Sequence, residues 1–185
     1  MFLHDIIQLK NEIKALKKQQ NETETRSKQS LIKANYNEQY SRKNNIKIMN
    51  IREKQKETEE DLITEVCGIM QDKGVPLDPQ KIMAIHRIPG KPDAPKPVLV
   101  KLTNNNEKSK IMRKRSDFKN AGNRLVDDVT KLNALLIQRL LEHSSIAQAW
   151  YFNGRVFGKT TDDKRVMFDL FDDVDSVLQA QGSRS

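Results

Sequence analysis

The stretch from residue 40 to residue 51 places cations and amides directly before a predicted strand. It reads Tyr-Ser-Arg-Lys-Asn-Asn and continues into 46–51, where polar side chains interrupt the apolar ones. Arg42 and Lys43 can both attract phosphate oxygens, and arginine does so with a planar pair of donors. We therefore interpret this junction as a candidate phosphate-binding edge. A solvated linker before a strand is the alternative interpretation.

The charge of the chain is positive and unevenly distributed. The 185 residues carry a formal net charge of +8, which favours a polyanionic partner such as nucleic acid or an acidic membrane surface. Residues 95–124 hold nine lysines and arginines against two acids, whereas residues 160–185 hold six acids against three cations. The middle of the chain is therefore expected to supply the positive field.

Several classes of protein receive no support from the sequence. No apolar run is long enough for a membrane span, and the N-terminus lacks the apolar region of a signal peptide. The single cysteine, Cys67, fits an intracellular protein in a reducing compartment. The three histidines are scattered, so no zinc spacing exists, and residues 154–160 have the wrong spacing for a phosphate loop. We predict a protein that is not an enzyme and has neither cofactor nor metal.

Residues 1–40 contain no proline or glycine and are predicted to form one helix. With Ile6 at heptad position a, Leu9 is d, Ile13 is a and Leu16 is d. Isoleucine at a with leucine at d is typical of a coiled coil and, in parallel geometry, favours two strands. We expect these four residues to mediate oligomerisation. The alternative is that the helix folds back onto the following domain.

Residues 41–127 alternate strand and helix patterns. The predicted order is strand 46–51, a helix opening at 59, strands 81–88 and 97–103, a helix over 107–118, and strand 123–127. This β-α-β-β-α-β order is the split plan of ferredoxin-like folds, which RNA-recognition motif domains also use. The fold class is therefore α+β.

Residues 128–180 are predicted to form a small second α+β domain. A leucine-rich helix capped by Asp128 or Thr130 leads into a hairpin at Asn153-Gly154, since both positions of such a turn need positive φ. A strand over 165–168 and a helix over 172–178 follow. Residues 181–185 are expected to be a disordered tail.

The predicted strands also suggest which side chains meet a ligand. Lys47 and Lys101 lie on the faces opposite the apolar positions of their strands, without an aromatic neighbour, so we expect backbone binding rather than base stacking. Residues Arg42, Lys43, Arg87 and Lys101 come from adjacent elements and are predicted to form one cationic track. Each has the alternative role of an ordinary solvated cation.

The predicted hairpin adds aromatic residues to the candidate site. Trp150 and Phe152 share one strand face, which we interpret as the core face. Tyr151 and Arg155 are then the better ligand candidates, because aromatics interleaved with cations suit single-stranded bases. A cleft between the two domains would let both surfaces hold one strand.

Several segments in this order resemble the first-open-reading-frame protein of LINE-type (long interspersed element) retrotransposons. The matching segments are 40–48, Ile-His-Arg-Ile at 85–88, Pro-Val-Leu-Val-Lys-Leu-Thr at 97–103, Asp-Val-Thr at 128–130, and Asn-Gly-Arg-Val-Phe at 153–157. The resemblance implies a coiled coil, an RNA-recognition motif domain and a small C-terminal domain. It also implies a homotrimer that packages element RNA as a cytoplasmic ribonucleoprotein, with nuclear residence left open, and acts as a nucleic-acid chaperone. Its binding positions would be Arg42, Lys43 and Arg87.

Two features depart from that family pattern. The apolar seam is short, which is consistent with a truncated copy, and its isoleucine and leucine residues do not specify a trimer, so a dimer stays open. The leading hypothesis is a self-associating protein that binds single-stranded RNA or DNA and no membrane. The alternative is a coiled-coil module for protein–protein interaction, without nucleic-acid function.

Overall fold

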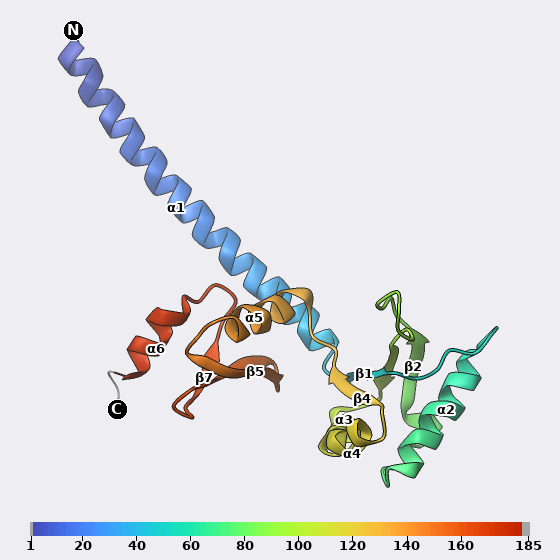
Figure 1. The fold of residues 1–185 in the computed structure, drawn as a ribbon. Helices are drawn as coiled ribbons and strands as arrows, with labels where there is room; N and C mark the ends of the chain where they lie inside the picture. The colour runs from blue at the N-terminus through green and yellow to red at the C-terminus, as the bar shows by residue number, and fades with distance from the viewer. Residues whose placement is uncertain (1, 183–185) are drawn as a thin grey trace.

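The computed structural model describes residues 2–182 and has an α+β architecture. One long helix leads into a four-stranded sheet unit, and a three-stranded sheet unit follows (Figure 1). Among the described residues, no helix is both long enough and apolar enough to cross a membrane.

The N-terminal helix, α1, runs from Phe2 to Ser41. It extends away from both sheet units as a rod, and only its C-terminal turns meet the rest of the chain (Figure 1). The predicted seam residues are exposed along it: Ile6, Leu9, Ile13 and Leu16. The helix therefore does not fold back on the following domain over this part of its length. An apolar stripe of this kind lacks a partner within a single chain.

The first sheet contains β1 (Asn45–Met49), β2 (Ile82–Arg87), β3 (Val98–Leu102) and β4 (Arg124–Asp127). The strand order is β2-β3-β1-β4, and every neighbouring pair is antiparallel. Each strand lies within one or two residues of its predicted position. In the central strand β1, Lys47 pairs with Leu99 of β3 and with Val126 of β4.

Helices cover one face of this sheet. They are α2 (Glu59–Asp72), α3 (Asn105–Arg113) and α4 (Arg115–Asn120). The short 3-10 helix η1 (Pro79–Lys81) directly precedes β2. Thr58 begins α2 with a capping box, because its side chain accepts from the Asp61 amide while Asp61 accepts from the Thr58 amide. The single helix predicted over 107–118 is two helices, separated at Lys114.

The core of the first unit lies between the sheet and these helices. Its residues alternate along each strand: Ile46, Ile48, Ile85, Val98, Val100, Leu102 and Leu125 face Leu62, Val66, Met70, Ile111 and Phe118. Among the described residues, no helix packs on the opposite face of the sheet. Lys47, Leu99 and Lys101 therefore lie on an uncovered face, as the alternation of their strands predicts.

The C-terminal unit contains α5 (Lys131–Leu141), β5 (Ile146–Phe152), β6 (Arg155–Thr160), β7 (Arg165–Phe168) and α6 (Val174–Gly182). Its strands form an antiparallel meander in the order β5-β6-β7. The predicted Asn153-Gly154 turn is confirmed, with φ of 48° and 88°. Of the predicted tail, residues 181 and 182 end α6, and 183–185 lie outside the described residues.

Candidate nucleic-acid interface

The predicted junction is built around the carboxylate of Asp128, which follows β4. Its oxygens accept hydrogen bonds from Arg42 Nη1 at 3.1 Å and from Asn45 Nδ2 at 2.9 Å. Lys47 Nζ lies 3.1 Å from the same carboxylate. Asp128 is buried. Two of the predicted ligand cations are therefore already paired with one buried acid.

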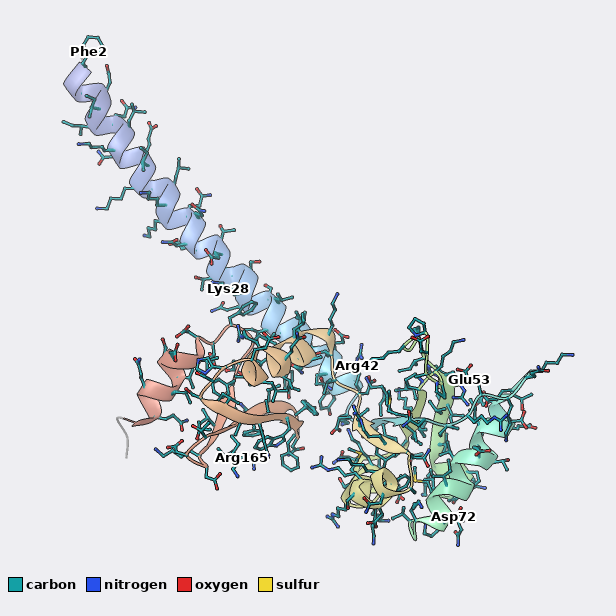
Figure 2. The ribbon with its side chains drawn as sticks, viewed as in Figure 1. Phe2, Lys28, Arg42, Glu53, Asp72 and Arg165 are labelled. Carbon is teal, nitrogen blue, oxygen red and sulfur yellow. The ribbon has the colours of Figure 1, made fainter. Side chains whose placement is uncertain are left out.

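The local field holds Asp128 in its charged form. Burial opposes ionisation, but hydrogen bonds from Asn45 and Lys47 and the positive charges of Lys47 and Arg42 outweigh it, so the pKa of Asp128 is lowered. The carboxylate therefore neutralises part of the positive charge at the junction. Arg42, which is labelled in Figure 2, also pairs with Glu38 one turn earlier in α1, so its guanidinium is anchored on two sides.

A buried network of amides continues from this carboxylate and fastens α1 to α5. Asn35 Nδ2 donates to Asn133 Oδ1 at 3.0 Å, and Asn133 Nδ2 donates to Gln39 Oε1 at 2.8 Å. Gln39 also donates to the carbonyl of Asp128 and accepts from the amide of Thr130, while the Thr130 hydroxyl donates to Asn35. We call these five residues, Asn35, Gln39, Asp128, Thr130 and Asn133, the polar lock.

The residues of the polar lock have structural roles that the sequence patterns do not reveal. Asn35 and Gln39 stand four residues apart on a mostly polar helix and share one face, but nothing local distinguishes them from solvated amides. Thr130, and not Asp128, is the N-cap of α5, because its hydroxyl accepts from the Asn133 amide. Asp128 instead joins the end of α1 to the first sheet.

Lys43 lies on the exposed side of the same junction. Its ammonium donates to the Tyr40 hydroxyl at 2.8 Å and stands 4.0 Å from the centroid of the Tyr40 ring. The Tyr36 ring stacks on Tyr40 at a centroid distance of 6.5 Å, and both rings are exposed. The hydrogen bond and charge of Lys43 lower the pKa of Tyr40. Two stacked rings on the last turns of α1 thus lie beside the cation of Lys43.

Arg87 occupies a different environment from the one that its sequence predicts. Its Nε and Nη2 form two hydrogen bonds with the Glu57 carboxylate, at 2.7 and 2.8 Å. Its guanidinium also donates to three carbonyls, those of Ile51, Arg52 and Lys96, at 2.7–2.9 Å. Only 11% of the side chain is exposed. Arg87 therefore ties the loop after β1 to the loop before β3.

The register of the sheet separates Arg87 from Lys101. Arg87 pairs with Val98, and Val98 points into the core beneath the helices. Lys101 alternates with Val100 and Leu102, so it lies on the uncovered face and is exposed. The predicted track of Arg42, Lys43, Arg87 and Lys101 is thus not one continuous surface, because Arg87 is on the other side of the sheet.

The second sheet turns its aromatic residues outward, which corrects the predicted face. Tyr151 is half-buried against the core with Val156, Val166 and Phe168, and burial raises its pKa. Because side chains alternate, Trp150 and Phe152 lie on the opposite, uncovered face; 57% of Phe152 is exposed. These two residues are therefore not core residues, and Tyr151 is on the packed side.

Cations and aromatic rings are interleaved on this outward face. The Trp150 and Phe157 rings stack with centroids 6.1 Å apart. Arg165 Cζ lies 3.9 Å from the Phe157 centroid, 5.4 Å from Trp150 and 5.6 Å from Phe152. Arg155 is exposed on the same face, with Nη1 3.1 Å from Met167 Sδ. We call Trp150, Phe152, Arg155, Phe157 and Arg165 the aromatic platform (Arg165 is labelled in Figure 2).

Counting charges along the hairpin would have revealed this platform. A two-residue turn makes Phe152 pair with Arg155 and Trp150 with Phe157. Arg155, Phe157 and Lys159 then share one face, and β7 adds Arg165 opposite Lys159. Three cations on one face indicate that this face is the solvated one. The large size of Trp150 and Phe152 suggests instead that this face is buried, and that prediction is wrong here.

Comparison with protein-family models finds no match to this chain, and a search of curated proteins finds no significant similarity.

Proposed function

We propose that this protein binds single-stranded nucleic acid, mainly RNA, without catalysing a reaction. The observation that carries the proposal is the aromatic platform, where Arg165 stands over three rings on an uncovered sheet face. Stacking of bases on aromatic rings contributes about 1–3 kcal/mol per base and tolerates any sequence. Arginine adds attraction for phosphate oxygens at the same place.

The first sheet unit supports the same function through its topology and charge. Its element order, with strand order β2-β3-β1-β4 and helices on one face only, agrees with an RNA-recognition motif arrangement. Its uncovered face offers Lys101 and Leu99, with Lys47 paired to Asp128, but no phenylalanine, tyrosine or tryptophan ring, so it would contact backbone phosphates more than bases. Lys43 and the two tyrosines of α1 would extend this contact surface.

Self-association through α1 completes the proposal. The exposed seam of Ile6, Leu9, Ile13 and Leu16 suits a parallel coiled coil, and several linked copies would raise the effective concentration of weak sites. With the ordered motifs that resemble LINE-type first-open-reading-frame proteins, we infer a retrotransposon RNA-packaging protein and nucleic-acid chaperone. It would act as an intracellular ribonucleoprotein, as a trimer by resemblance or as a dimer.

The test is binding of a labelled single strand by the full chain at several salt concentrations. Phe152→Ala is expected to weaken binding roughly 5- to 150-fold, which corresponds to the loss of one stacked base at about 1–3 kcal/mol. Phe171→Ala is the matched control, because Phe171 is also an exposed phenylalanine but lies outside the platform. The proposal fails if the wild-type chain does not bind at low salt or if the two variants behave alike.

A protein–protein interaction module is the second candidate function. It is favoured by the uncovered face of the first sheet, which has no phenylalanine, tyrosine or tryptophan ring to stack on bases. It predicts binding to a protein partner with little dependence on salt, whereas phosphate contacts weaken linearly with the logarithm of salt concentration. The same titration, run with both kinds of partner, separates the two functions.

A further inference from the structure

The helices behind the first sheet carry a compact group of exposed cations that the proposed interface does not use. Between residues 113 and 119 there are four cations and one acid. Lys114 pairs with that acid, Asp117, at 3.5 Å. Arg113, Arg115 and Lys119 are exposed and form no ion pair with any residue that the structure describes. We call these three residues the helical cation patch.

The patch and the uncovered sheet face point in opposite directions. Ile111 of α3 and Phe118 of α4 are buried against the face of the sheet that carries Ile46 and Val100. The two helices lie beneath the sheet, on the side away from α1 (Figure 1). A helix with its side chains is about 10–12 Å thick, so the sheet and the helix layer together separate the patch from a strand that lies on Lys101.

The composition of the patch favours a polyanion over a protein partner. Protein interfaces have an apolar, desolvated centre rich in aromatic residues. Among the described residues of α3 and α4, no large apolar side chain is exposed, because Ile111 and Phe118 are buried and Met112 is half-buried. Two guanidinium groups match phosphate geometry. Arg115 and Lys119, one turn apart, share a helix face at a spacing of roughly 6 Å.

We propose that the helical cation patch is a second nucleic-acid site, which binds the phosphate backbone of another strand while the sheet faces hold the first. This inference rests on the proposed nucleic-acid binding and extends it to a second strand. One protomer would bridge two strands on opposite sides of its first sheet unit. Bringing two strands together in this way is a physical basis for annealing and compaction, without any requirement for sequence recognition.

The test compares strand binding with strand bridging in the same full-length variants. The variant Arg113→Gln/Arg115→Gln/Lys119→Gln removes the patch, and Lys56→Gln/Lys81→Gln/Lys91→Gln removes an equal charge from exposed lysines elsewhere in the unit. Binding is measured with a uridine oligonucleotide of about 10 nucleotides, within the usual range of site sizes. Bridging is measured as energy transfer between donor- and acceptor-labelled non-complementary strands, with the protein limiting.

The patch variant is expected to bind the short oligonucleotide within about threefold of wild type, because screened charges act over about a Debye length. Its bridging should fall more than about tenfold, and the salt slope of bridging should fall by about 2, or ~0.7 per lost phosphate contact. The lysine control should retain both activities, and thermal melting of both variants should match wild type.

Two outcomes overturn the inference. If the patch variant still bridges strands, bridging does not need the helical cation patch. If the lysine control loses as much bridging as the patch variant, only overall charge matters. Failure of the wild-type chain to bind the short oligonucleotide would instead refute the proposed function itself, so the two failures are distinguishable.

Discussion

Lys47 Nζ in the centre of the first sheet lies 3.1 Å from Asp128 Oδ1, at the entrance to the C-terminal unit. The same carboxylate receives Arg42 from the end of α1. One acid therefore contacts all three parts of the protein, and the polar lock continues the contact into α5. This arrangement fixes how α1 and the two sheet units are oriented relative to one another.

Removing the charge of Asp128 should loosen this junction. Asp128→Asn keeps the shape but leaves Lys47 and Arg42 without their common acid. We expect the free energy of unfolding to fall by roughly 1.5–3 kcal/mol, the range for hydrogen bonds to charged groups. Urea denaturation measures the change, and Asp162→Asn, at an exposed aspartate, is the control. Equal stability of the two variants would contradict a structural role for the carboxylate.

The same carboxylate should make stability depend on acid pH. The folded-state pKa of Asp128 is lowered, so the unfolded chain takes up its proton at a higher pH than the folded protein does. The stabilisation is complete above the unfolded pKa of about 3.9 and is lost as pH falls from there through the folded pKa. The stability difference between wild type and Asp128→Asn should shrink over that window. A difference that stays constant with pH would show that the charge of Asp128 is not responsible.

Arg87 should contribute mainly to stability. Its side chain donates to Glu57 and to three loop carbonyls, and lysine cannot reproduce this planar geometry. Arg87→Lys is therefore expected to lower the free energy of unfolding by about 2–4 kcal/mol, since partners of a largely buried ion lose their compensation. A double-mutant cycle with Glu57→Gln should give a coupling energy of roughly 1–3 kcal/mol. A direct binding role would appear instead as lost strand affinity in Arg87→Lys at temperatures where it is fully folded.

The exposed seam of α1 should control assembly. Ile13→Asp places a charge at a predicted core position of the coiled coil, whereas Lys14→Asp changes the charge of the neighbouring, outward position. Light scattering is expected to show a smaller species for Ile13→Asp and the wild-type mass for Lys14→Asp, because a buried charge without a partner is strongly disfavoured. The wild-type mass also distinguishes a dimer from a trimer. If both variants keep that mass, the seam is not the interface.

The hairpin and the first sheet illustrate how far local patterns reach. Asn153-Gly154 predicts its turn because positive φ is a local property of those two residues. The alternation of side chains along Val98–Leu102 is also a local property, and it correctly places Lys101 on the uncovered face of the sheet. For the strand that contains Trp150 the sequence predicts the wrong face, because large aromatic side chains pack either in a core or on a solvated surface, and only the neighbouring strands decide which.

The sequence by itself determined the α+β order, the long N-terminal helix, the strand positions and the excess of positive charge in the middle of the chain. These follow from periodicity, turn residues and composition, which act over a few neighbouring positions. Tertiary structure alone decided that Asp128 joins three elements and that Asn35 and Gln39 are buried against α5. It also decided that Arg87 and Lys101 lie on opposite faces of the first sheet. Those contacts join residues 11 to 98 positions apart, and a pairing at such separation is set by how whole faces pack, which no short stretch of sequence encodes.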